Sequence, residues 1–157
     1  MALEIERKFL VNREAWRPTD RFKHCKQGYL SIGPPVAVRV RIMDSVGTLN
    51  IKTSTVEIER MEFEYEIPLD DAEELLEEAC LGRIVEKTRY YADYGGMRWE
   101  IDVFEGANEG LIVAEVELDD PEQAFIKPEW ALAEVSHDPR YLNSNLSLYP
   151  YSVWRKR

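Results

Sequence analysis

The chain has 157 residues, of which 45% are hydrophobic, and it carries 30 acidic against 20 basic side chains, for a net charge of −10. This length suits a single domain, residues 1–157, that buries a substantial core. With no run of 18 apolar residues and with charge beginning at the fourth position, we expect a cytoplasmic protein without a membrane span or secretory signal, and the acidic balance disfavours nucleic acid as a partner.

About eight segments are predicted as β-strands, most of them because apolar residues alternate with charged ones. In the first, Glu4, Glu6 and Lys8 share one face, opposite the apolar face that contains Ile5. Arg7 falls on the apolar side, so we expect it outside any site formed by its neighbours. Short turns that contain Gly or Pro separate the segments, as antiparallel hairpins require. The expected strands are residues 3–10, 25–32, 36–43, 47–53, 59–67, 84–92, 97–104 and 111–119.

Helices are fewer and are marked by local start signals. Asp70 followed by Glu73 has the spacing of a capping box for the first helix. Asp120-Pro121 has the pattern of an N-cap and a first helical residue for the second. The expected helices are residues 70–81, 121–125, 129–135 and 140–149.

The charged rows of the strands differ from an ordinary solvated sheet face. Each row taken alone is typical of the wet face of an antiparallel sheet. Together, however, they are mostly basic on some strands and mostly acidic on others, instead of mixed. About eight strands can close into a barrel, with charge inside and apolar rows outside under helices such as 70–81. We therefore expect an α+β, mainly β fold: a closed eight-stranded antiparallel barrel with a charged lumen and helices packed outside.

The order of these charged residues resembles the CYTH superfamily, the triphosphate tunnel metalloenzymes. A single Glu-x-Glu-x-Lys motif is a weak signal, whereas an ordered series across residues 3–119 is specific. The series is Glu4-x-Glu6-x-Lys8, Arg39-x-Arg41, Lys52, Glu62-x-Glu64, Lys87-x-Arg89, Asp102 and Glu115-x-Glu117. The stretch from Asp138 to Ser144 is also similar to the closing helical segment of that family. The resemblance implies a tunnel that hydrolyses or cyclises triphosphates, including inorganic tripolyphosphate, thiamine triphosphate and ATP, with Mg²⁺ or Mn²⁺.

The basic residues of the series are the candidate substrate-binding groups. Phosphoryl transfer depends mainly on positioning and on neutralising negative charge, and guanidinium and ammonium groups provide both. Lys8 has an alternative role as a structural partner of Glu4 or Glu6, and Arg60 has an alternative as a surface residue at a strand end. The substrate-binding candidates are Lys8, Arg39, Arg41, Lys52, Arg60, Lys87 and Arg89.

The acidic residues are the candidate metal ligands, because Mg²⁺ prefers oxygen ligands and keeps several waters. Closure of a barrel brings its first and last strands together, which would place Glu4 and Glu6 near Glu115 and Glu117. Glu66 and Glu100 share the parity of the charged rows but are equally suited to ion pairs at the rim. The metal candidates are Glu4, Glu6, Glu62, Glu64, Asp102, Glu115 and Glu117, and the catalytic candidates are Glu4, Glu6 and Lys8.

Several other reactive side chains are assigned structural roles. Cys25 and Cys80 lie far apart without Cys-x-x-Cys spacing and are expected to be free, buried thiols. His24 and His137 have no ligand spacing and are expected at the surface or in capping positions. Tyr29 is assigned to packing, with contact to the tunnel mouth as the alternative.

The resemblance and the charge pattern together predict a divalent-metal-dependent triphosphate hydrolase, with inorganic tripolyphosphate as the first choice of substrate. Its expected partner is a small-molecule triphosphate, with neither nucleic acid nor membrane involved, and formation of a homodimer is left open. Adenylate cyclase and thiamine triphosphatase are alternatives in the same tunnel. A non-catalytic polyphosphate-binding protein is the alternative outside enzymes, since a lipocalin-like barrel would need an apolar lumen.

Overall fold

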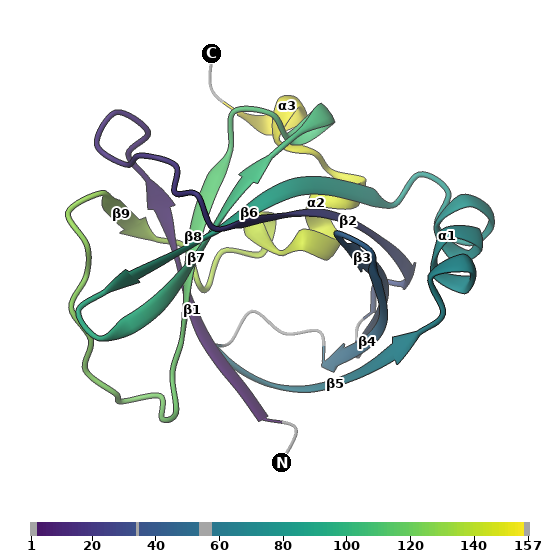
Figure 1. Ribbon diagram of the computed structural model, residues 1–157, viewed down its shortest axis with the longest axis horizontal. Helices are drawn as coiled ribbons and strands as arrows, with labels where there is room; N and C mark the ends of the chain where they lie inside the picture. The colour runs from purple at the N-terminus through teal and green to yellow at the C-terminus, as the bar shows by residue number, and fades with distance from the viewer. Residues whose placement is uncertain (1–2, 34, 54–57, 156–157) are drawn as a thin grey trace.

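The computed structural model describes residues 3–33, 35–53 and 58–155. These ranges contain nine strands, three α-helices and two short 3-10 helices (Figure 1). The strands are β1 (Leu3–Val11), β2 (Phe22–Ser31), β3 (Val36–Met43), β4 (Val46–Thr53), β5 (Glu59–Ile67), β6 (Ile84–Tyr94), β7 (Met97–Phe104), β8 (Ile112–Glu117) and β9 (Ala131–Glu134). The helices are α1 (Leu69–Glu78), α2 (Asn143–Leu148) and α3 (Tyr151–Trp154), with 3-10 turns η1 (Gly106–Asn108) and η2 (Pro139–Tyr141).

Eight of the described strands form a closed antiparallel ring, and Figure 1 looks into its opening. The order around the ring is β1, β5, β4, β3, β2, β6, β7, β8 and back to β1. β1 completes the ring because its first half pairs with β5, where Glu4 lies opposite Arg60, and its second half pairs with β8, where Lys8 lies opposite Glu115. The predicted eight-stranded barrel is therefore confirmed.

The outer face of the ring is apolar, as the alternation predicts. Ile5 and Phe9 of β1 lie in a buried cluster with Trp99 of β7 and Val116 of β8. β9 pairs with the second half of β1 beside this cluster, and Phe125 from the preceding loop packs against it. This side of the barrel is thus covered by a strand and loops, whereas helix α1 covers another side.

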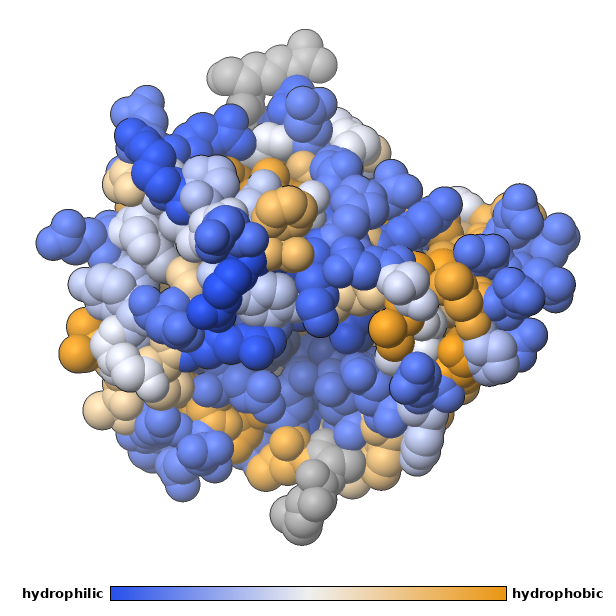
Figure 2. Space-filling view, viewed as in Figure 1, coloured by the Kyte–Doolittle hydropathy of each residue, from blue (hydrophilic) through white to orange (hydrophobic). Residues whose placement is uncertain are grey.

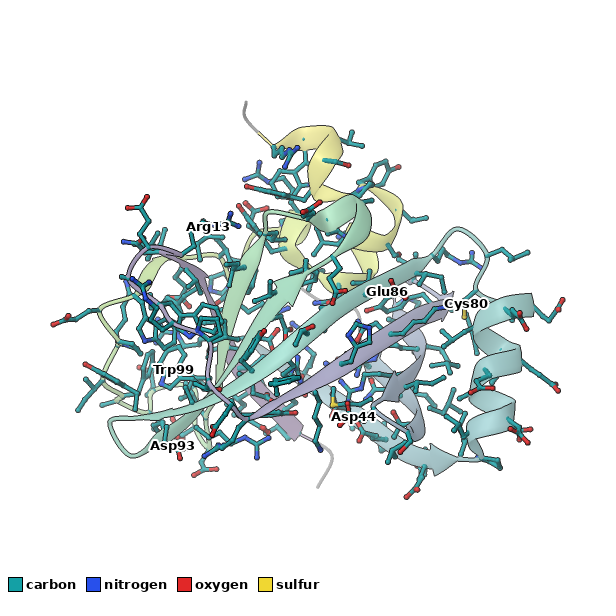
Figure 3. All side chains as sticks on the ribbon, turned by 45° about the horizontal axis from the view of Figure 1, so that its top comes forward. Arg13, Asp44, Cys80, Glu86, Asp93 and Trp99 are labelled. Atoms are coloured by element: carbon teal, nitrogen blue, oxygen red, sulfur yellow. The ribbon has the colours of Figure 1, made fainter. Side chains whose placement is uncertain are left out.

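Helix α1 covers β3 and β4, and Figure 3 shows Cys80 beside it, on the opposite side of the molecule from Trp99. The helix buries Ala72 and Leu76 against Val40, in a second apolar cluster that includes Cys80. Both cysteines are free and buried, as expected. Among the described residues, no helix is long and apolar enough to cross a membrane.

The start of α1 differs from the sequence prediction. Pro68 occupies the N-cap position and no side chain caps the helix, so the predicted capping box of Asp70 and Glu73 was wrong. Pro68 has φ −56° and its carbonyl accepts the first helical hydrogen bond from Ala72, at 3.0 Å. The fixed φ of proline preorganises the chain at this point, so the helix begins one residue before Asp70.

Two predicted helices are absent from the described chain. Residues 129–135 contain the strand β9 instead, because the free edge of β1 offers hydrogen-bond partners: Phe9 pairs with Glu134. Residues 121–125 form a turn and loop, in which the Asp120 carboxylate accepts from the backbone N–H of Glu122 at 2.8 Å. The predicted helical segment 140–149 is present as η2 and α2.

Candidate functional site

The ring encloses a cavity of about 200 Å³ that is lined almost entirely by polar and charged side chains. Figure 2 shows the hollow near the centre of this face, among hydrophilic residues. All of the predicted substrate-binding residues line it: Lys8, Arg39, Arg41, Lys52, Arg60, Lys87 and Arg89. The acidic residues that line it are Glu4, Glu6, Glu62, Glu64, Glu100, Glu115 and Glu117. The charged rows therefore face the lumen, and the reading as solvated surface is excluded.

Lysines on two strands bridge carboxylates from their neighbours. The Lys8 ammonium lies 3.9 Å from a carboxylate oxygen of Glu6 and 3.8 Å from one of Glu115. On the other side of β1, the Lys52 ammonium lies 3.2 Å from Glu4 and 3.0 Å from Glu62. Each lysine thus joins acidic groups that are far apart in sequence, which the closure of the ring brings together.

Two pairs of carboxyl groups are close enough to share protons. Burial, the nearby Glu6 and a hydrogen bond to Glu62 raise the pKa of Glu4 to about 8. Burial opposes ionisation of Glu62 too, but the hydrogen bond from Glu4 and the charge of Lys52 lower the pKa of Glu62 to about 2. Glu6 is hydrogen-bonded to Glu115 in the same way, and Lys52 and Lys8 overcome burial to lower its pKa to about 2. The acidic wall therefore holds protons that a cation could replace.

The basic wall contains donors that lack partners. Arg39 and Arg41 project from β3, and the Nε atom of each is buried without a hydrogen-bond partner in the described chain. Burial and the charges of Arg39 and Arg89 lower the pKa of Arg41. Since buried polar groups are nearly always hydrogen-bonded, unpartnered guanidinium donors at a cavity wall indicate a site for an anion.

Asp102 differs from the other predicted acidic residues because it lies behind the wall. Its side chain is 0% exposed and is not among the residues that line the cavity. One oxygen accepts from the Lys87 ammonium at 2.8 Å, and the Arg89 guanidinium donates to both oxygens, at 2.8 and 3.0 Å. These cations hold the pKa of Asp102 well below its usual value despite its burial. Its geometry suits a residue that positions Lys87 and Arg89, while its role as a metal ligand stays a prediction.

Glu100 and Glu66, which share the parity of the charged rows, lie in different positions relative to the cavity. Glu100 contributes a carboxylate to the rim, 3.2 Å from Arg89 and 3.6 Å from the exposed Arg98, which is the ion pair expected for it. Glu66 is exposed and does not line the cavity. His24 is also exposed, with Nδ1 3.6 Å from Glu105.

Polar residues that the sequence analysis did not assign line the cavity or lie directly behind its wall. Asn50 of β4 lines the wall and donates to Glu64 at 3.1 Å. Gln27 of β2 is fully buried and donates to the Tyr29 hydroxyl at 3.2 Å and to Asn143 at 3.3 Å. Asn50 shares strand parity with Lys52, which could have identified it, whereas the residues two positions from Gln27 are Cys25 and Tyr29. Asn143 lies in α2, so alternation along strands gives no signal for it.

Comparison with known proteins identifies the family. A model of the CYTH domain matches residues 2–147 of the chain. The chain belongs to the CYTH family. An inorganic triphosphatase of Acetivibrio thermocellus is 43% identical over 156 residues, which cover 99% of this chain and 100% of that protein. One from Nitrosomonas europaea is 40% identical over 151 residues, covering 92% and 97%.

A solved CYTH-type structure has the same fold over almost the whole chain. The crystal structure of the inorganic triphosphatase NE1496 matches with a TM-score of 0.67 and 37% identity, covering 94% of this chain and 96% of that one. The CYTH match ends at residue 147, so it includes all of α2 except its last residue, Leu148, and does not reach α3. The resemblance predicted from the charged series is confirmed.

Proposed function

We propose that this CYTH protein hydrolyses inorganic tripolyphosphate inside its barrel, with Mg²⁺ or Mn²⁺ as cofactor. The observation that carries the proposal is the buried lumen lined by basic and acidic side chains, in which Arg39 Nε and Arg41 Nε lack hydrogen-bond partners among the described residues. Two relatives at 43% and 40% identity are inorganic triphosphatases, which supports the choice of substrate.

The basic wall would bind and orient the phosphate chain. Arg39 and Arg41 can each present a guanidinium group to phosphate oxygens, and Arg89, which Asp102 holds in place, adds a fixed positive charge to the wall. Lys8 and Lys52 add ammonium groups from neighbouring strands. Because this charge is already in place before the reaction, it stabilises negative charge on the transferring phosphoryl group without reorganisation.

The acidic wall fits a divalent cation, because oxygen ligands are those that Mg²⁺ and Mn²⁺ prefer. Glu4 and Glu62 form one carboxyl pair, Glu6 and Glu115 form another, and Glu4 Oε1 is buried 3.2 Å from the Lys52 ammonium. Among the described residues, no three such groups converge to enclose an ion, so the carboxylates would share it with water and phosphate oxygens. When bound, the ion offsets phosphate charge and favours deprotonation of water.

The residues of β1 would act next to the reacting phosphate. Lys8 is held between Glu6 and Glu115 at 3.8 to 3.9 Å, and it lines the cavity. Its ammonium could therefore donate to a phosphate oxygen there. Glu4, whose pKa of about 8 lies near neutral pH, can accept a proton from an attacking water once its own proton is lost. Glu6 keeps its negative charge, because its pKa is about 2, and holds both lysines in place.

The lining gives little surface for an organic group. Among the described residues that line the cavity, Tyr29 is the one aromatic side chain. Adenine and the thiamine rings are usually bound by stacking and apolar contacts, so a substrate made of phosphate alone matches this lining best.

Phosphate release by the purified protein tests the proposal. Tripolyphosphate, ATP and thiamine triphosphate would be supplied separately with Mg²⁺, with Mn²⁺ and with EDTA. We expect the fastest release from tripolyphosphate and loss of activity in EDTA. Cyclic AMP as the main product would show a cyclase, and tight binding without release at any metal concentration would show a binding protein; either result would contradict the proposal.

A further inference from the structure

Part of the cavity wall comes from outside the barrel. The eight described strands are hydrogen-bonded all round the ring, so a side chain from another element reaches the lumen only through one of its ends. Leu142, Asn143 and Ser144 line the cavity although they belong to the start of α2. Helix α2 lies beside β2 and β6 (Figure 1). These residues therefore cover one end of the tunnel.

The side chain of Asn143 has one orientation that suits its neighbours. Its Oδ1 accepts from the Lys87 ammonium at 2.9 Å and from Gln27 Nε2 at 3.3 Å. An ammonium group is a donor only, so the amide oxygen must face Lys87 and the amide nitrogen must face away from it. Within the described residues, Asn143 Nδ2 makes no hydrogen bond. The covered end of the tunnel thus presents a donor without a protein partner.

The neighbours hold this arrangement rigidly. Lys87 is 1% exposed and is fixed on its other side by Asp102 at 2.8 Å. Gln27 is fully buried and is held by Tyr29 and by the Cys25 thiol, whose sulfur lies 3.4 Å from Gln27 Oε1. Because the network fixes Asn143 before any ligand binds, its amide nitrogen can recognise an anion at little entropic cost.

We propose that Asn143 is a specificity-determining residue whose Nδ2 donates to the terminal phosphate of a linear polyphosphate. The polyphosphate enters the tunnel from the opposite end, and its terminal phosphate stops against the segment of Leu142, Asn143 and Ser144. The inference rests on the proposed function for the class of ligand, and it adds that the site recognises a free end of the chain. A cyclic triphosphate has no terminal phosphate and cannot make this contact.

Two variants separate a contact with phosphate from support of Lys87. Asn143→Asp keeps an oxygen toward Lys87 and Gln27 but replaces the amide donor by an oxygen that repels phosphate. Asn143→Ala removes both functions. Asn145→Asp and Asn145→Ala are matched controls on the same helix, because Asn145 Nδ2 donates to the Pro139 carbonyl at 2.7 Å and does not line the cavity.

Calorimetric titration of the purified proteins with linear tripolyphosphate and with cyclic triphosphate is the test, alongside KM for the linear compound. For the linear chain, we expect about 10-fold weaker binding in Asn143→Ala and about 100-fold in Asn143→Asp, the range for a hydrogen bond to a charged group. Asn143→Ala should weaken binding of the cyclic compound clearly less than binding of the linear one, because for the cyclic compound only the support of Lys87 is lost, and neither control should differ from wild type by more than about twofold.

The outcomes separate this inference from the proposed function. Linear binding by Asn143→Asp as tight as in wild type would overturn the inference and leave Asn143 as a support of Lys87. Equal losses for linear and cyclic compounds in Asn143→Ala would also overturn it. If wild type shows the expected binding pattern but releases no phosphate, the inference stands and the proposed hydrolysis fails. Absence of any binding of linear tripolyphosphate to wild type would contradict both.

Discussion

The inner and outer faces of the barrel wall are built by the same strands but bury different kinds of side chain. On β7, Trp99 and Ile101 face outward and are fully buried among apolar side chains, whereas Glu100 faces the lumen among charged ones. The outer face is apolar, and the donors it leaves without a hydrogen-bond partner among the described residues, such as Trp99 Nε1, are uncharged. The inner face buries charge at a free-energy cost and leaves donors such as Arg39 Nε unpartnered. The apolar contacts of the outer face therefore stabilise the fold, whereas the charged groups of the inner face are available to bind a ligand.

The largest effect on stability should come from the outer face. Trp99→Ala removes a fully buried ring that packs on Phe9, Phe125 and Trp130 at centroid distances of 5.7 to 5.8 Å. We expect the free energy of unfolding to fall by about 3 to 5 kcal/mol. Urea denaturation followed by fluorescence measures this. A loss below about 1 kcal/mol would show that the cluster is not the main source of stability.

The converse result is expected on the inner face. Arg39→Ala removes a buried guanidinium whose cost of burial offsets its attraction to Glu62, so the free energy of unfolding should change little or rise. Phosphate release from tripolyphosphate should fall by about 100- to 1000-fold, as for loss of a preorganised donor. Steady-state kinetics and a denaturation curve on one preparation compare the two. Arg39→Lys, which keeps the charge without the fork, should recover only part of the activity.

The next effect in size is a dependence of stability on pH, which we expect from Glu4 on the inner face. Because the pKa of Glu4 is raised from 4.5 to about 8, the folded metal-free protein holds a proton that the unfolded chain loses in this interval. The free energy of unfolding should therefore fall as pH rises from about 5 to 8, by on the order of 2 kcal/mol for this group. Glu4→Gln should remove that part of the slope.

The opposite sign applies to Glu6 and Glu62, whose pKa values are lowered to about 2. They contribute stability above about pH 4.5, and that contribution is lost as pH falls toward 2. Urea denaturation in EDTA between pH 2 and 8 covers both intervals. A slope in Glu4→Gln equal to that of wild type between pH 5 and 8 would contradict the shared proton of the Glu4 and Glu62 pair.

The smallest effect is expected at Arg7, the outward neighbour of Lys8. Its guanidinium donates to Glu134 at 2.8 Å on the partly exposed outer side, where ion pairs contribute about 1 kcal/mol or less. Arg7→Ala should therefore leave phosphate release within about twofold of wild type, whereas Lys8→Ala should abolish most of it. Equal losses in the two variants would contradict the assignment of β1 faces.

The comparison also explains which features could be predicted from sequence. Alternation is local, so it predicted the lumen-facing positions of Lys8 and Arg39, and the number of strands together with the charge of their rows was enough to predict the closed ring. It failed where partners distant in sequence decide the structure. Residues 129–135 read as a helix, yet the free edge of β1 makes Ala131–Glu134 a strand.

Two residues of the site lay beyond the same local signal. Asp102 shares the parity of the lumen residues, but only the packing shows that Lys87 and Arg89 occupy its oxygens. Asn143 reaches the cavity from a helix, a position that strand alternation does not describe. In both cases contacts between distant segments determine the role.

If the basic side chains of the inner face bind a polyanion, tripolyphosphate should stabilise the folded protein. Thermal unfolding in its presence measures this stabilisation. A ligand that binds the folded state stabilises it by about 2.7 kcal/mol at 100 times its Kd. We expect tripolyphosphate to raise the Tm of metal-free wild type by several degrees, with a much smaller rise in Arg39→Ala and an undiminished rise in Arg7→Ala. An unchanged Tm in wild type, or the same rise in Arg39→Ala, would contradict this expectation.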